Sequence, residues 1–242
     1  MTSTARLDGL TIMITGANRG LGAALVTEAL SRGAGRVYAG SRHPLPFVDH
    51  RVIPVRLDVT DADDIAAAAD EIDELDVLIN NAGILRYDDL TDRASLNEHL
   101  AVNLFGPHAL TQALLPRLID ARGRLVNILS IAALAPLPVT PAYSLSKAAA
   151  FSMTQSLRAL LTATGVRIHA VLAGPIDTDM IRDVDVAKAP PAEVARAILD
   201  GMLAGREEIF PDPMSAAIAA AWNTSAVKAM EQANASYLDQ AG

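Results

Sequence analysis

Short runs rich in β-branched residues alternate along most of the chain with longer segments rich in alanine and leucine. Several short runs are apolar at every position, as in Val77-Leu78-Ile79, which is typical of strands buried on both faces of a parallel sheet. The expected strands are residues 10–14, 36–39, 52–57, 77–79, 124–129, 167–172 and 208–210. The expected helices are residues 21–32, 61–72, 95–119, 143–163 and 191–204. This alternation predicts an α/β fold, a doubly wound parallel sheet of about seven strands flanked by helices and joined by right-handed crossovers.

The composition favours a single domain and disfavours nucleic acid as a partner. The chain has 242 residues, 51% of them apolar, and no linker, repeat or low-complexity block divides it, so residues 1–242 are predicted to form a single domain. The formal net charge of -8 disfavours nucleic acid as a partner. Because there is no cysteine, disulfides and thiolate metal sites are excluded, and the reducing cytoplasm is favoured.

The sequence shows no membrane signal. Residues 1–10 lack the long apolar core of a signal peptide and are expected to form a short loose arm. The most apolar stretch, residues 125–139, is interrupted by Asn127, Ser130 and two prolines and is too short to span a bilayer. We therefore expect a cytoplasmic protein that does not bind membranes.

A glycine-rich turn joins the first expected strand to the first expected helix, in the segment Thr15-Gly16-Ala17-Asn18-Arg19-Gly20-Leu21-Gly22. Glycines allow a tight turn and a close approach of the backbone to phosphate, and the amino end of a helix attracts an anion. The spacing Gly-x-x-x-Gly-x-Gly differs from the usual Gly-x-Gly-x-x-Gly dinucleotide fingerprint. A plain glycine-rich turn is the alternative, but a strand before it and a helix after it favour a phosphate site.

Two arginines predict which dinucleotide is preferred. Ser41 and Arg42 follow the second expected strand, where an acidic residue would bind ribose hydroxyls and repel a 2′-phosphate. Arg19 in the glycine loop could point the same way, and two guanidinium groups suit a phosphate. The alternative is that both arginines are solvated surface residues. We expect NADP(H) to be preferred, with NAD(H) possible.

Tyr143 and Lys147 lie one helical turn apart, so both side chains leave the same face of a helix. A phenol has an ordinary pKa of about 10, and a nearby ammonium lowers that pKa, which makes the pair a candidate proton donor. Alone, such a pair is more often a surface contact. Its weight comes from the glycine loop, the segment Asn80-Asn81-Ala82-Gly83 and Ser130, which precede it in that order.

Together these motifs resemble the single-domain branch of the short-chain dehydrogenase/reductase family, with its TGxxxGxG and YxxxK patterns, over residues 10–210. The resemblance implies a Rossmann-like fold. It also implies an oxidoreductase, a carbonyl reductase or alcohol dehydrogenase that transfers a hydride between NADP(H) and a ketone, an aldehyde or a secondary alcohol.

The resemblance assigns four catalytic roles. Tyr143 resembles the general acid/base, and Lys147 resembles the group that lowers its pKa and binds the nicotinamide ribose. Ser130 resembles the hydroxyl that binds the substrate oxygen, and Asn103 resembles the residue that interrupts a helix and holds a proton-relay water.

The resemblance also implies contacts to the cofactor. Asp58 resembles the residue beside the adenine ring, and Thr178 resembles the residue that bonds the carboxamide. The full expected set of cofactor-binding residues is Gly16, Asn18, Arg19, Gly20, Leu21, Gly22, Ser41, Arg42, Asp58, Val59, Asn80, Ala82, Gly83, Tyr143, Lys147, Gly174, Ile176 and Thr178. The chain departs from the family at Ala173, where proline often precedes Gly174, and this leaves the backbone path near the nicotinamide open.

Each of these residues has a purely structural alternative. Ser130 could be an ordinary hydroxyl at a strand end, and Asn103 could bend a helix. Asp58 could cap the following helix, and Asn80 or Asn81 could order a turn. The presence of all four catalytic residue types in order favours catalysis.

Apolar residues flank the expected site. Those between Ser130 and Tyr143, and those just after Gly83, could wall a pocket for an apolar or aromatic carbonyl compound, or could only pack a loop. Residues 179–190 are a short, charged candidate lid, which suggests an open site that accepts varied substrates. The five histidines lack metal-ligand spacing, so structural or surface roles and no metal site are expected.

The remaining features concern assembly and competing functions. Two expected helices, residues 104–119 and 143–163, are apolar nearly all round, which predicts helix pairing between subunits. The family resemblance implies that this pairing forms a homodimer or homotetramer. Trp222 is expected to pack an alanine-rich tail, residues 216–221, against the fold.

A non-catalytic NADP(H)-sensing regulatory protein is the main alternative, but a sensor needs no proton donor. A nucleotide-sugar epimerase or dehydratase is disfavoured by the glycine spacing and the lack of a carboxy-terminal substrate domain.

Overall fold

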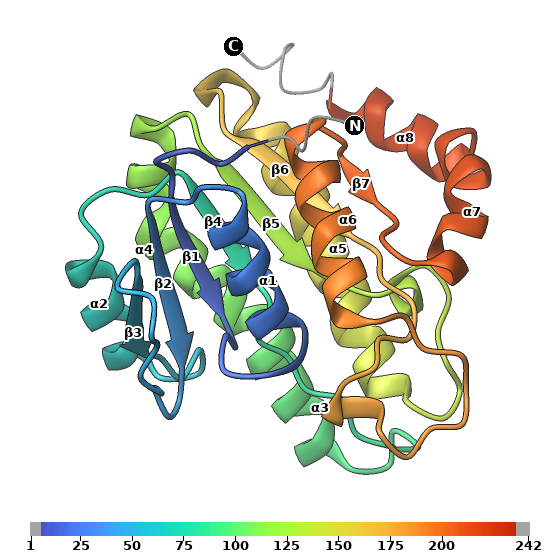
Figure 1. Cartoon of the computed structure of the whole chain (residues 1–242). Helices are drawn as coiled ribbons and strands as arrows, with labels where there is room; N and C mark the ends of the chain where they lie inside the picture. The colour runs from blue at the N-terminus through green and yellow to red at the C-terminus, as the bar shows by residue number, and fades with distance from the viewer. Residues whose placement is uncertain (1–5, 236–242) are drawn as a thin grey trace.

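The computed structural model describes residues 6–235 and contains one parallel sheet of seven strands in the order β3-β2-β1-β4-β5-β6-β7 (Figure 1). The strands are β1 Thr11–Thr15, β2 Arg36–Ser41, β3 Val52–Arg56, β4 Val77–Asn80, β5 Arg124–Ile128, β6 Arg167–Val171 and β7 Glu208–Ile209. The order reverses between β1 and β4, so a crevice opens there at the carboxyl ends of the strands, where open α/β sheets bind ligands. The expected doubly wound sheet is confirmed.

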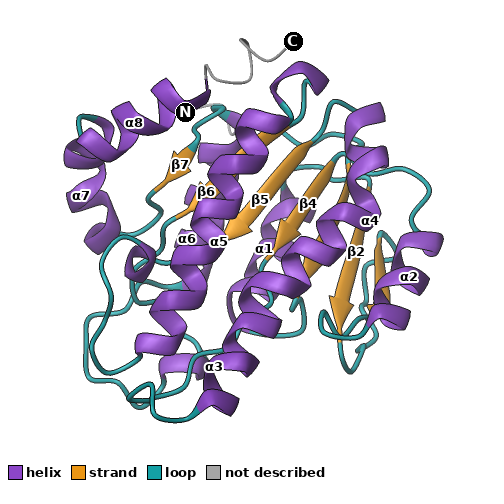
Figure 2. Cartoon of the chain, turned by 180° about the vertical axis from the view of Figure 1, so that it is seen from behind, coloured by secondary structure: helices purple, strands orange, loops and turns teal. Residues whose placement is uncertain are grey.

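Helices cover both faces of the sheet. They are α1 Gly20–Ser31, α2 Ala62–Glu71, α3 Arg93–Leu100, α4 Gly106–Asp120, α5 Pro141–Leu160, α6 Pro191–Leu203, α7 Pro213–Asn223 and α8 Ala226–Ala235. Helices α1 and α6 lie in front of the sheet in Figure 1, whereas α2, α4 and α5 face the viewer in Figure 2. A separate apolar cluster fills each of these two interfaces, which explains why the strands are apolar on both faces.

The helix expected over residues 95–119 is divided by a π-helical turn, Ala101–Phe105. Within this turn the N–H of Gly106 donates to the carbonyl of Ala101, five residues back. Pro107 has no N–H and so cannot donate to the carbonyl of Asn103, four residues earlier. The wider π-helical turn accommodates this proline, and such turns occur often at functional sites.

The carboxy-terminal helices lie beside the edge strand β7 (Figure 2). Trp222 of α7 packs on Phe151 of α5 with ring centroids 5.4 Å apart, so the expected packing of the tail is confirmed. In α8, the buried Lys228 ammonium lies 2.6 Å from Glu207, 3.0 Å from Glu208 and 3.1 Å from Glu231. These three carboxylates are close enough together to hold a metal ion, but Lys228 and Arg158 already form ion pairs with all three.

The expectation of a loose amino-terminal arm is wrong for the part of the arm that the structure describes. Residues 1–5 lie outside the described part of the chain, but the Leu7 side chain is fully buried and its N–H donates to the Arg32 carbonyl at 2.9 Å. Among residues 6–235, no helix combines the length and apolarity needed to cross a membrane.

Candidate functional site

The glycine loop forms a tight cradle between β1 and α1. Gly16 and Gly20 have positive φ angles, +66° and +54°, which residues with a Cβ rarely adopt. A Cβ on Gly22 would lie 2.1 Å from the Gly16 carbonyl oxygen, so the turn closes only around glycine. The side chain of Arg19, just before α1, makes no capping hydrogen bond, and α1 has no acidic residue in its first turn. The amino end of α1 therefore suits a phosphate.

The end of β2 offers a polar site next to this cradle. Ser41 is the last residue of β2, and its hydroxyl is buried without a hydrogen-bond partner among the described residues. Arg42 follows directly and lies close enough to Asp58 to help lower the pKa of that carboxyl. A buried hydroxyl beside an arginine fits a 2′-phosphate.

Arg19 does not join this pair as expected. Its guanidinium lies 3.5 Å from Asp179 on the segment after β6, and both side chains are largely exposed. An exposed pair of this kind contributes little stability. One of the two guanidinium groups expected at a 2′-phosphate is thus engaged elsewhere in the protein.

The ends of β1 and β4 are tied together where the sheet order reverses. The Thr15 hydroxyl accepts the N–H groups of Asn81 and Ala82, both at 2.9 Å. The Asn81 amide returns a hydrogen bond to the Thr15 carbonyl at 2.8 Å. Asn80 points inward and donates to Thr111 and Asn127 at 3.1 and 2.9 Å. The Asn81 side chain therefore orders the turn, whereas the Asn80 side chain contacts buried polar groups behind the sheet edge.

The other expected cofactor residues converge on the same edge of the sheet. Asp58 follows β3, and its carboxylate accepts hydrogen bonds from the N–H and hydroxyl of Thr60, which lower its pKa. It does not cap α2, because Asp61 does. Thr178, after β6, lies against the glycine loop, since a Cβ on Gly20 would be 3.1 Å from its methyl group. Leu21 and Val59 are buried, and Asn18, Ala82, Gly83, Gly174 and Ile176 are partly buried beside these turns.

Tyr143 and Lys147 project from the first turns of α5 toward the end of β5. The Lys147 nitrogen lies 5.7 Å from the centre of the Tyr143 ring and donates to the Ile128 carbonyl at 2.9 Å. Ser130 follows β5, and its hydroxyl lies close enough to the Tyr143 phenol to lower the pKa of that phenol. The structure therefore brings Ser130, Tyr143 and Lys147 together as expected.

The electrostatics of the pair differ from the expectation. Burial raises the pKa of Tyr143 above its usual value, and the nearby Ser130 hydroxyl offsets this only in part. Burial also lowers the pKa of Lys147 to about 8. In the protein alone, Lys147 therefore does not bring the phenol toward neutrality. Both shifts have the same cause, which is that a buried site disfavours charge.

Asn103 lies in the π-helical turn, and both the oxygen and the nitrogen of its side-chain amide are hydrogen-bonded. Its oxygen accepts the N–H of Ile84 at 2.9 Å, while its nitrogen donates to the Ile84 carbonyl at 3.0 Å and to the Ser146 hydroxyl at 2.9 Å. Next to it lies a cavity of about 10 Å³, lined in part by Lys147 and Asn80. The Asn80 side-chain oxygen is buried and has no hydrogen-bond partner in the described part of the chain. This space has the size and polarity to hold one water.

The His99 ring packs edge-on against the Tyr143 ring, a contact that the sequence did not indicate. It is fully buried, with its ring at an edge-on angle to the Tyr143 ring and centroids 6.4 Å apart. Its Nδ1 lies 2.8 Å from the Ser95 carbonyl, and its Nε2 accepts the N–H of Arg86 at 3.1 Å. His99 lies one helical turn before Asn103, and this spacing could have indicated that it faces the same site.

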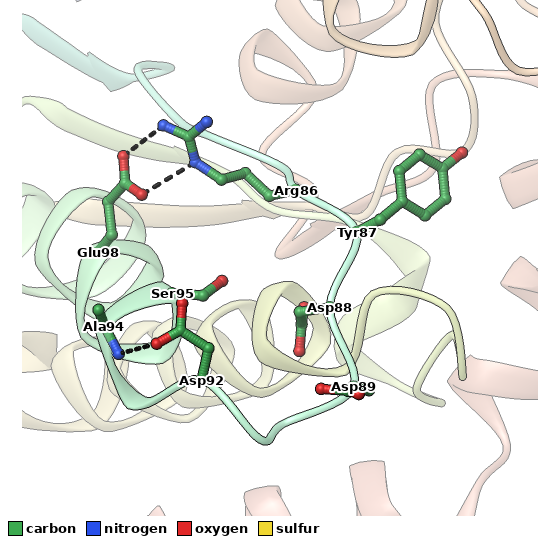
Figure 3. Close-up of a pocket in the computed structure, with 8 residues that line it drawn as sticks. All are labelled: Arg86, Tyr87, Asp88, Asp89, Asp92, Ala94, Ser95 and Glu98. Atoms are coloured by element: carbon green, nitrogen blue, oxygen red, sulfur yellow. Dashed lines mark hydrogen bonds and ion pairs between the residues drawn. The ribbon is translucent and has the colours of Figure 1, made fainter.

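The segment after β4 runs beside the start of α5. The Asp88 carboxylate accepts the N–H of Ala142, the residue before Tyr143. A surface pocket of about 710 Å³ adjoins this segment (Figure 3). Its lining residues are Arg86, Tyr87, Asp88, Asp89, Asp92, Ala94, Ser95 and Glu98. Arg86 pairs with Glu98, Asp92 caps α3 through Ala94, and none of the four candidate catalytic residues lines the pocket.

The candidate lid is a loop closed at its base. Ile176 bridges to Ala189 in parallel fashion, and the Ala189 N–H donates to the Pro175 carbonyl at 2.9 Å. Large apolar side chains are exposed on the segments that follow β4, β5, β6 and β7, namely Tyr87, Leu137, Val139, Met180 and Met214. The carboxyl edge of the sheet is therefore bordered by apolar groups.

Comparison with known proteins gives a coherent result. The sequence model of the family described as short chain dehydrogenase matches residues 10–189. The chain is 33% identical over 215 residues to a 2-(R)-hydroxypropyl-CoM dehydrogenase of Xanthobacter autotrophicus, a match that covers 76% of this chain and 85% of that protein. It is 29% identical to the oxidoreductase UcpA of Salmonella typhimurium over 80% of this chain and 81% of that protein.

Solved structures show the same fold. A short chain dehydrogenase from Burkholderia cenocepacia in complex with NADP superposes with a TM-score of 0.86 at 37% identity, covering 94% of this chain and 98% of that chain. A short chain dehydrogenase/reductase from Burkholderia phymatum in complex with NAD shares the fold, with a TM-score of 0.78 at 22% identity over 88% of this chain and 92% of that chain.

Proposed function

Because this chain belongs to the short-chain dehydrogenase/reductase family, and is thus an oxidoreductase acting on CH–OH groups, we propose that it prefers NADP(H) and acts on apolar or aromatic carbonyl compounds or the corresponding alcohols. The observation that carries the proposal is the meeting of Ser130, Tyr143 and Lys147 at the carboxyl end of β5. The apolar side chains that border this edge support a substrate of low polarity.

The residues divide the chemistry among them. The hydroxyls of Ser130 and Tyr143 hydrogen-bond the substrate oxygen, on which negative charge grows during reduction. Bound NADPH supplies the hydride, and the Tyr143 O–H supplies the proton. The raised pKa of Tyr143 keeps the phenol protonated, which is the form that reduction needs.

Lys147 and the small cavity beside Asn103 serve the return of the proton. Lys147 uses one N–H on the Ile128 carbonyl, which leaves two donors for the nicotinamide ribose and for a water. The cavity beside Lys147 and Asn103 has room for that water. Since the Asn103 amide is engaged by Ile84 and Ser146, the side-chain oxygen of Asn80 is the acceptor that faces no competing donor.

Turnover of Tyr143→Phe tests the catalytic assignment. NADPH consumption is followed across aryl, alicyclic and β-keto carbonyl compounds. We expect turnover to fall by about 10²-fold or more while the dissociation constant for NADPH stays unchanged, because only the proton donor is removed. Tyr38→Phe, within β2 and outside the candidate site, is the matched control and is expected to behave like wild type. Near-normal turnover in Tyr143→Phe would remove this residue from the role.

The cofactor preference is tested by binding. We expect NADPH to bind more tightly than NADH, and Arg42→Leu to reduce the difference, because Ser41 and Arg42 offer a site for the 2′-phosphate. Arg36→Leu, at the opposite end of β2, is the control. Equal affinity for the two cofactors, or tighter NADH, would refute the preference. Tight NADPH binding without turnover of any compound would instead favour the regulatory alternative.

Assembly into a homodimer or homotetramer is part of the same proposal. Phe105, Leu145 and Leu160 are large, exposed apolar residues on the π-helical turn and on α5. Pairing of these helices between subunits would remove them from water. A monomeric mass in light scattering would refute this.

A further inference from the structure

Asp212, between β7 and α7, is a buried carboxylate that holds the segment after β6. It is 5% exposed. One of its oxygens accepts the Gly174 N–H at 2.7 Å and the Ser215 hydroxyl at 2.7 Å, and the other accepts the Ser215 N–H at 3.0 Å. A buried carboxylate requires such donors, and the amino end of α7 adds its favourable dipole. Asp212 lies outside residues 10–189, to which the family model is matched.

The peptide group between Ala173 and Gly174 is held from both sides. Its N–H donates to Asp212, and its carbonyl accepts the N–H of Ile131 at 3.0 Å, directly after Ser130. Because a peptide group is planar, these two hydrogen bonds together fix its orientation. The same peptide group therefore links the segment carrying Ser130 to the segment carrying Ile176 and Thr178.

The fit around Gly174 is close. A Cβ on this residue would lie 2.5 Å from the Asp212 carboxylate and 3.3 Å from the Cβ of Met214. The backbone at the position where the family often has a preceding proline is thus held by a carboxylate from the far end of the chain. Alanine at position 173 does not fix the backbone φ angle, whereas a proline there would.

We propose that Asp212 is a positioning residue that fixes the Ala173–Gly174 peptide group, and through it the nicotinamide-binding segment that contains Ile176 and Thr178. The inference rests on the proposed function together with the contact that the family resemblance implies between Thr178 and the nicotinamide carboxamide. Asp212 touches neither substrate nor cofactor, and it acts only through the backbone.

Two variants separate this role from the capping of α7. Asp212→Ser retains a good helix cap but is too short to reach the Gly174 N–H. Ser215→Ala removes the hydroxyl from the cap yet leaves the carboxylate on Gly174. The dissociation constants of NADPH and of 2′,5′-ADP, which carries no nicotinamide, are measured for both variants and wild type by calorimetry, together with kcat, KM and the melting temperature.

In Asp212→Ser we expect NADPH to bind about tenfold more weakly, 2′,5′-ADP to bind as in wild type, and kcat to fall by about tenfold or more, since small misplacements at a reacting centre have large effects. Ser215→Ala should keep the wild-type ratio of the two dissociation constants. If Asp212→Ser does not fold, Asp212→Asn preserves the side-chain volume with one acceptor oxygen instead of two, and the same selective loss is expected.

An unchanged ratio of the two dissociation constants in the Asp212 variants, or an equal selective loss in Ser215→Ala, would overturn the inference while leaving the proposed function intact. Failure of the wild-type protein to bind NADPH would refute both.

Discussion

Acidification should destabilise the protein through His169, which lies in β6 and is 1% exposed. Burial lowers its pKa from 6.5 to about 4, the Arg206 carbonyl opposes this shift, and three arginines reinforce it, namely Arg124, Arg158 and Arg167. The unfolded chain therefore binds a proton near pH 6.5, whereas the folded protein resists protonation until about pH 4. Stability is highest above this window and falls as the pH drops through it, because the unfolded state binds more protons.

The size of the effect follows from the two pKa values. With 6.5 in the unfolded chain and about 4 in the folded protein, linkage gives a loss of about 2 kcal/mol between pH 7 and pH 5, growing to about 3 kcal/mol at pH 4. Other groups also titrate in this range, so the comparison must be with a variant that lacks only this one. His169→Asn cannot titrate and retains a donor that can reach the Arg206 carbonyl.

Urea unfolding at pH 7, 6 and 5 measures the difference. We expect wild type to lose about 2 kcal/mol more than His169→Asn between pH 7 and pH 5, whatever the offset between the two proteins at pH 7. His43→Asn, an exposed histidine, is the control and should follow the wild-type curve. Parallel curves for wild type and His169→Asn would show that this histidine does not resist protonation.

Three further outcomes are expected. Gly22→Ala places a Cβ 2.1 Å from the Gly16 carbonyl oxygen, so calorimetry should show a lower melting temperature and no NADPH binding; a wild-type dissociation constant would contradict this. Lys228→Met leaves a buried carboxylate short of a partner, so urea unfolding should show a loss of about 3 kcal/mol, and unchanged stability would refute it. Asn80→Leu should slow turnover and alter the pH profile of turnover without affecting NADPH affinity. Thr111→Val leaves the Asn80 side-chain oxygen in the cavity and should keep the wild-type profile. Identical profiles in the two variants would show that this oxygen does not take part in the return of the proton.

The features that could be predicted from sequence are those with local causes. The strands of the sheet were located to within about two residues, because a strand buried on both faces must be apolar throughout. The glycine cradle was evident because only glycine permits the turn, as the positive φ angles of Gly16 and Gly20 confirm. The shared helix face of Tyr143 and Lys147 followed from their four-residue spacing, whereas the place of Ser130 beside them was implied by the family resemblance.

Other features depended on neighbours that are distant in sequence. The pKa of Tyr143 rises because the fold buries the phenol, an effect that the four-residue spacing to Lys147 could not reveal. Arg19 lies by Asp179, and the buried Leu7 donates its N–H to the Arg32 carbonyl, because tertiary packing brings those partners near.

Local patterns in the sequence therefore determined the fold class, the glycine turn and the Tyr143–Lys147 pair, since periodicity, glycine geometry and helical spacing operate over a few residues. The other residues of the site were assigned through the family resemblance. Only the tertiary structure decided how charged the site can be and what holds its segments in place. Burial is a property of the whole fold, and a hydrogen bond such as that between Asp212 and Gly174 joins residues 38 positions apart.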